Sequence, residues 1–206
     1  MYSKYKIGYY RGVSMEKEEQ SYKKSKNIIG IIQSCLILIL IVLIIFIMVN
    51  ISRLQGTFRV INYAGLVRGA TQREVKLEIT GNPDDELIKY LDDILTDLKY
   101  QNGQYNLVDL HDKEYHDRLQ ILSNYWEELK KEIKAVREAG YQNTDIVNMS
   151  EIYFKMADET VFAAENYSER IAIKIRTLEL LSVFDMLCLV ILIVIQTLAA
   201  MKMACL

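Results

Sequence analysis

The sequence predicts an all-α protein in which two transmembrane helices flank an extracytoplasmic, antiparallel four-helix bundle. Two unbroken apolar runs, residues 28–49 and roughly 180–201, bracket about 130 mostly polar residues. The polar part is rich in Leu, Ile, Lys, Glu and Asp, and the whole chain has one proline. Such a composition favours long helices over strands. Apolar residues recur in the polar part at spacings of three and four, the period of a half-buried helix.

The two apolar runs are each long enough to cross a bilayer. The first, Ile28 to Val49, has 22 residues and no charge, which is about 33 Å of helix. The chain continues VNISRLQGTF without the small-residue cleavage site of a signal peptide. The second run is interrupted only by Asp185, which we expect at the interface with water, and by Gln196. We therefore predict transmembrane helices at 28–50 and 180–201.

The charges that flank the first run predict the orientation of the chain. The tail of residues 1–27 holds seven Lys or Arg against three Glu, so the positive-inside rule makes it cytoplasmic. Two spans return the short tail, residues 202–206, to the cytoplasm and leave residues 51–179 outside. That segment has 17 basic and 23 acidic residues, which argues against nucleic acid as a partner.

The turns between the outer helices can be placed from residue types. The first helix continues from the membrane to Gly81, which suits a left-handed C-terminal cap. Asn82 is expected as the next N-cap and Pro83 as the first residue of the second helix, which runs to about Tyr100. The third helix is expected over 113–138.

Gly140 is expected to end the third helix. Residues 143–145, Asn-Thr-Asp, supply caps for the fourth helix, and nothing breaks that helix before the second span.

The apolar positions of each helix predict its buried face. They are Val60, Ile61, Ala64, Val67, Thr71, Val75 and Ile79 in the first helix; Leu87, Leu91, Leu95 and Leu98 in the second; Tyr115, Leu119, Leu122, Trp126, Leu129, Ile133 and Val136 in the third; and Ile152, Met156, Thr160, Ala163, Tyr167, Ile171 and Ile175 in the fourth.

Catalytic, metal-binding and cofactor-binding motifs are not found in the sequence, so an enzyme is not expected. His111 and His116 are five residues apart, a spacing that puts two residues on different sides of a helix, and no HExxH, nucleophile elbow or phosphate loop occurs. Carboxylates near His116 are better explained by pairing with a helix dipole. A bundle joined to two spans by continuous helices is instead suited to carrying a displacement across a bilayer.

Residues 61–73, INYAGLVRGATQR, carry a resemblance to known receptors. The pattern resembles the membrane-proximal motif of nitrate/nitrite sensor histidine kinases and of type IV pilus chemoreceptor-like sensors. The matching residues are Ile61, Asn62, Ala64, Gly65, Arg68, Gln72 and Arg73. The resemblance implies a ligand-sensing input module of a bacterial transmembrane signalling receptor, of the kind used in two-component systems and chemotaxis.

The rest of the outer segment is similar to sensor regions that precede diguanylate cyclase (GGDEF) or histidine kinase domains. The segments concerned are GNPDDELIKYLDDIL, YWEELKKEI and ADETVFAAENYSERIA. This similarity implies an output domain after the second span, where the chain has only residues 202–206. We expect the sequence to be truncated before a diguanylate cyclase, histidine kinase or methyl-accepting domain. The alternative is a membrane-anchored helical bundle, without a sensory role, that binds another membrane protein.

Arg68 is the candidate ligand contact, with Asn62 and Gln72 in support. At about 100° per residue, Arg68 projects from a seam of apolar and small residues. In a homodimer joined along this seam two guanidinium groups would face each other, which is unfavourable until a small anion sits between them. Alternatively, Arg68 pairs with an acidic residue of the second or fourth helix, or extends into water.

Two glutamines are expected to pack the spans together within the lipid. Gln33 lies five residues inside the first span, and Gln196 five residues before the end of the second. Antiparallel packing places them at the same depth, where a side-chain hydrogen bond would contribute about 0.6 kcal/mol. Alternatively, each contacts lipid headgroups independently.

Overall fold

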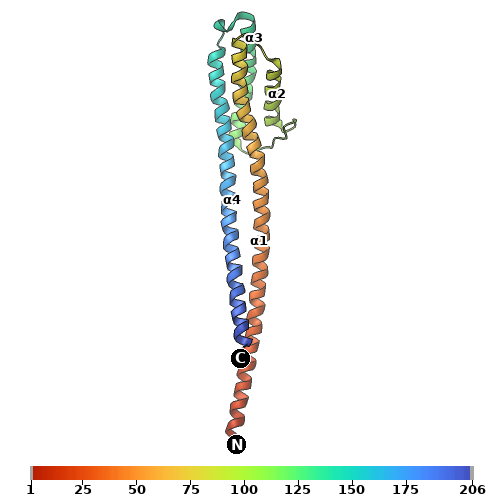
Figure 1. The fold of residues 1–206 in the computed structure, drawn as a ribbon, viewed down its shortest axis with the longest axis vertical. Helices are drawn as coiled ribbons and strands as arrows, with labels where there is room; N and C mark the ends of the chain where they lie inside the picture. Colours follow the sequence, from red (N-terminus) through yellow and green to blue (C-terminus); the bar gives the residue numbers. More distant parts are fainter. Residues whose placement is uncertain (1, 205–206) are drawn as a thin grey trace. The chain divides into compact units, whose positions relative to one another are not determined.

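The computed structural model describes residues 2–204, and the side chains of residue 20 and residues 22–202. Within this range the chain is helical and contains no strand, so the all-α prediction is confirmed. The elements are α1 (Tyr2–Ile79), α2 (Asp85–Tyr100), α3 (Lys113–Ala139), the short 3-10 helix η1 (Tyr141–Asn143) and α4 (Ile146–Ala204) (Figure 1).

The chain divides into two compact units. We call Met1–Met48 together with Arg176–Leu206 the apolar unit, and Val49–Ile175 the polar unit. α1 and α4 each contribute residues to both. Each of these two helices contains a stretch that is long and apolar enough to cross a membrane.

Many apolar side chains of the apolar unit are exposed. Leu38 and Leu198 are typical, with more than half of each side chain exposed, as expected for helices that have lipid for a neighbour. Asp185 is buried instead of reaching water as we expected, and its Oδ2 has no hydrogen-bond partner among the described residues.

The predicted hydrogen bond between the span glutamines is not formed. Gln33 Nε2 is buried, and it has no hydrogen-bond partner among the residues that the structure describes. Gln196 instead lines a cavity of about 300 Å³ with residues of α1 that include Tyr22, Lys26 and Ile29. The residues of α1 that line this cavity end about one turn before Gln33.

The polar unit has a single hydrophobic core to which all four α-helices contribute. All seven positions predicted to be inward in α3 are buried. In α4 the prediction for Ile152 is wrong: this side chain is exposed, whereas Tyr153 is fully buried. The buried stripe of α4 includes Ile146, Ser150, Tyr153 and Ala157, and a residue directly before Tyr153 points about 100° away from it.

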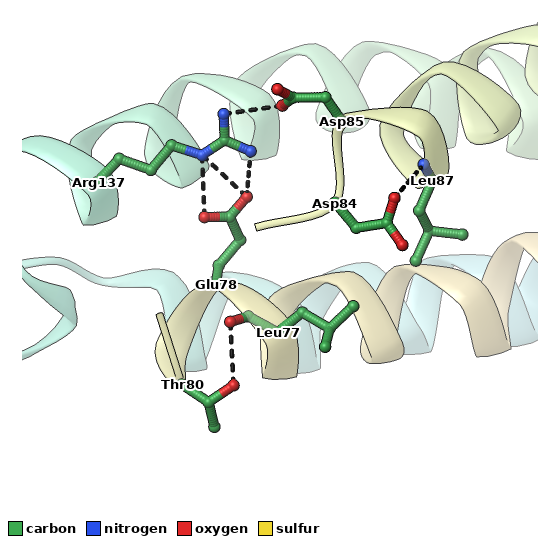
Figure 2. Close-up of polar contacts among 7 residues, drawn as sticks. All are labelled: Leu77, Glu78, Thr80, Asp84, Asp85, Leu87 and Arg137. Atoms are coloured by element: carbon green, nitrogen blue, oxygen red, sulfur yellow. Dashed lines mark hydrogen bonds and ion pairs between the residues drawn. The ribbon is translucent and has the colours of Figure 1, made fainter. Parts of the chain in front are cut away.

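The turn between α1 and α2 corrects another prediction. Gly81 has a φ of +73° and caps α1 as expected. However, Asp84, and not Asn82, is the N-cap of α2: its carboxylate accepts the Leu87 backbone N–H at 3.0 Å (Figure 2). Pro83 therefore lies before the helix. An ionised carboxylate at this position also complements the helix dipole, which an amide cannot do.

Candidate functional site

Arg68 of α1 reaches across to α4. Its guanidinium forms an ion pair with Asp158 and lies 5.5 Å from the centre of the Phe154 ring. The side chains of Arg68 and Asp158 are 37% and 59% exposed, respectively. The sequence left open whether Arg68 binds an anion, pairs with an acidic residue or extends into water. In the structure it pairs with a carboxylate of the fourth helix. An external anion must therefore compete with Asp158.

Gln72, one turn further along α1, also contacts α4. Its Nε2 donates a hydrogen bond to the Ser150 carbonyl at 2.9 Å. Arg68 pairs with residue 158 and Gln72 with residue 150, so α1 and α4 run in opposite directions here. Two of the three predicted ligand residues therefore lie at one α1–α4 contact.

The other motif residues are distributed around α1. Asn62 and Arg73 are exposed, Ala64 is buried, and Ile61 is partly buried against the core. Asn62 lies about 120° around the helix from Arg68 and does not join it. A methyl group added at Gly65 would meet no atom within 4 Å, so this side of α1 is open in a single copy of the chain.

Asp109, in the segment between α2 and α3, joins the two histidines. His116 Nε2 lies 2.8 Å from one carboxylate oxygen, and His111 Nδ1 contacts the other. The two histidines meet at Asp109 despite their spacing of five, because His111 precedes α3 and has a φ of +45° instead of lying on the helix. Burial alone would raise the pKa of Asp109, but the His111 backbone N–H and the two imidazoles lower it below the usual value.

Asp109 and His111 also line a cavity of about 390 Å³ in the polar unit. Arg53 and Thr57 of α1 and Tyr167 of α4 contribute to its wall. The described residues contain no cluster of three or more His, Cys, Asp or Glu that could hold a metal ion.

A third polar cluster lies at the turn between α1 and α2. Arg137 of α3 donates from Nε to both carboxylate oxygens of Glu78, at 3.0 Å each, and its other arm lies 2.8 Å from Asp85 (Figure 2). The Glu78 side chain is 1% exposed. Glu74, one turn earlier on α1, is fully buried. The prediction of the inward face omitted both glutamates, although their positions continue the seam formed by Thr71 and neighbouring residues.

Comparison of the chain with protein-family models, with curated proteins and with solved structures gives no match.

Proposed function

We propose that this chain is the ligand-sensing input module of a bacterial transmembrane signalling receptor. In this proposal the polar unit is an extracytoplasmic four-helix bundle, and the chain crosses the cell membrane twice with both termini in the cytoplasm. The displacement it transmits would be read by an output domain of the diguanylate cyclase, histidine kinase or methyl-accepting class.

The continuity of α1 and α4 is the observation that carries the proposal. α1 runs unbroken over Tyr2–Ile79 and α4 over Ile146–Ala204, and each contains one candidate span. A continuous helix moves as a rod, so a shift of α1 against α4 in the polar unit is passed along both helices. A coupling free energy of about 1–3 kcal/mol between ligand and output is the usual scale for such a transition.

The contact between Arg68 and Asp158 is where we place the ligand. This contact joins α1 and α4 and is accessible to solvent. An exposed ion pair contributes only about 0–1 kcal/mol to the free energy of folding. Replacement of the Asp158 carboxylate on Arg68 by a small anion therefore costs little free energy. In the proposal, this replacement breaks the ion pair between α1 and α4. In a homodimer joined along the open side of α1, the same anion would also neutralise the partner's Arg68.

A binding titration of the full chain in nanodiscs against a panel of small anions, including nitrate, nitrite, sulfate and acetate, tests this site. Arg68→Ala should weaken binding at least tenfold, because it removes a charged hydrogen bond. Arg73→Ala is the matched control: Arg73 is exposed on the same helix and forms no ion pair among the described residues, so affinity should change less than twofold.

Asp158→Asn should change the affinity for the anion in the opposite direction. It removes the internal competitor for Arg68, so affinity for the anion should rise by about two- to fivefold, which corresponds to the free energy of an exposed pair. If no anion binds to the wild-type chain, or if Asp158→Asn and Arg68→Ala leave affinity unchanged, the anion-sensing mechanism is wrong.

The second candidate function is a membrane-anchored interaction module. It is favoured by exposed aromatic side chains on the polar unit, of which Phe162 is 61% and Phe58 55% exposed, and by the internal partner of Arg68. This function predicts no anion binding. It predicts loss of complex formation with a membrane-protein partner when Phe162 is changed to Ser.

A further inference from the structure

Glu74 lies on the inner face of α1 with no access to solvent. Among the described residues, neither of its carboxylate oxygens has a hydrogen-bond partner. An ionised carboxylate in such surroundings is disfavoured, because it loses its hydration. A protonated carboxyl has no charge and is much better tolerated.

The groups that face Glu74 make its ionisation still less favourable. Glu78, on the same helix, and Asp84, at the start of α2, contribute negative charge. Arg137 is the cation that α3 supplies to this cluster. Its guanidinium already binds the carboxylates of Glu78 and Asp85. The buried residues at the start of α4, Ile146 and Ser150, have no charge.

These surroundings have a definite effect on titration. Burial raises the pKa of Glu74 from 4.5 to about 7, and the neighbouring Glu78 carboxyl and the charge of Asp84 act in the same direction, against a smaller opposing contribution from the Asp84 backbone. A pKa of 7 means that the folded chain binds this proton about 300-fold more tightly than an exposed glutamate does.

We propose that Glu74 is a proton-binding site through which the packing of α1 in the polar unit responds to pH in the weakly acidic to neutral range. The proposal is independent of the anion site at Arg68, which lies almost two turns away on α1.

The direction of the pH response follows from linkage. The folded state binds the proton more tightly than the unfolded state, so the contribution of Glu74 to stability is complete below pH 4.5 and is lost as the pH rises to about 7. Above that pH the folded chain must hold a buried charge or open around it. We expect the end of α1 next to the α1–α2 turn to loosen first, because the charge cluster is there.

Thermal and denaturant unfolding of the full chain in nanodiscs between pH 5 and pH 8 tests the proposal. Trp126 is the only tryptophan and is buried in the core, so its fluorescence reports the unfolding of the polar unit. Glu74→Gln mimics the protonated side chain at every pH. The unfolding equilibrium constant of the wild type should rise on the order of 50-fold relative to that of Glu74→Gln over this range.

Glu86→Gln is the control, since Glu86 is exposed in the first turn of α2 and should leave the wild-type pH dependence unchanged. All other titratable groups are common to the wild type and Glu74→Gln, so the difference in pH dependence between these two proteins is the result to be compared.

Difference infrared spectroscopy of the folded wild type supplies a second measurement that does not depend on the stability of the variant. It should detect a protonated carboxyl that ionises near pH 7 and that is missing from Glu74→Gln. Equal pH dependence of the wild type and Glu74→Gln, or a wild type without a carboxyl that titrates near neutrality, would overturn the proposal.

Discussion

At the scale of single residues, Arg137 joins three helices of the polar unit. One guanidinium on α3 binds Glu78 of α1 and Asp85 of α2 (Figure 2). The hydrogen bonds with Glu78 raise the pKa of Arg137 above its usual value, so the cation is always present. Because the Glu78 side chain is almost completely buried, its negative charge depends on this partner.

Arg137→Ala should therefore reduce the free energy of unfolding by on the order of 3 kcal/mol, since it leaves a buried carboxylate without its cation. Urea denaturation followed by Trp126 fluorescence measures the change. Lys134→Ala, which removes an exposed i,i+4 pair with Glu138 at 3.9 Å, should change stability by less than about 0.5 kcal/mol. Equal effects of the two substitutions would mean that the Glu78 charge is compensated elsewhere.

Asp97 holds the segment that follows α2 through hydrogen bonds to its backbone. Its side chain is fully buried, and its two oxygens accept the backbone N–H groups of Gly103 at 2.8 Å and Tyr105 at 2.9 Å. A Cβ at Gly103 would lie 2.7 Å from the Asp97 carboxyl carbon, so the turn closes around the carboxylate. The hydrogen bonds replace the secondary structure that this segment lacks.

Asp97→Ala should destabilise the polar unit by about 2 kcal/mol, because two backbone N–H groups lose their acceptor. Hydrogen exchange should speed up locally, over residues 101–112, in addition to the loss of global stability. Asp93→Ala, an exposed position on the same helix, is expected to change neither property. An unchanged exchange rate at Gly103 and Tyr105 in Asp97→Ala would contradict this role.

At the scale of elements, the helix that sequence predicted best is α3. Its seven inward residues recur strictly at three and four, and Asp112 and Gly140 cap its ends, so local signals and tertiary packing agree. The start of α2 was missed because two side chains two residues apart can both act as an N-cap, and the length of the reversal decides between them.

Long-range contacts explain the remaining errors. α4 carries apolar residues on two neighbouring stripes, and only the packing of the other helices selects the one that contains Tyr153. The wheel of α1 placed Arg68 on an inward seam but could not name Asp158, which is 90 residues away. Glu74 was missed because a glutamate within an apolar seam is normally exposed.

The open side of α1 carries a prediction about association. A Cβ atom added at Gly69 would meet nothing within 4 Å in a single copy of the chain, apart from the backbone of its own helix. If homodimers form along this side, Gly69→Leu should separate the helices and weaken self-association at least tenfold, as measured by subunit exchange in detergent. Lys131→Leu, at an exposed position on α3, is the control for added apolar surface. An unchanged dimer in Gly69→Leu would exclude this side of α1 as the interface.

At the scale of the whole molecule, α1 and α4 each combine a candidate span with residues that build the polar core. In the receptor proposal both candidate spans cross the membrane, so the polar unit is expected on one side and both ends of the chain on the other. The exposed apolar side chains of the candidate spans, such as Leu38 and Leu198, are compatible with a lipid environment. The topology of the chain is thus the claim on which the receptor proposal depends.

Labelling of single cysteines in intact cells with a membrane-impermeant maleimide tests this claim most directly. Cys35, Cys188 and Cys205 are first replaced by serine, and one cysteine is then introduced at Ser25, Lys131 or Lys202. The account predicts that Lys131→Cys reacts in intact cells, whereas Ser25→Cys and Lys202→Cys react only after the membrane is permeabilised. Reaction of all three from the same side, or of Ser25→Cys alone in intact cells, would contradict it.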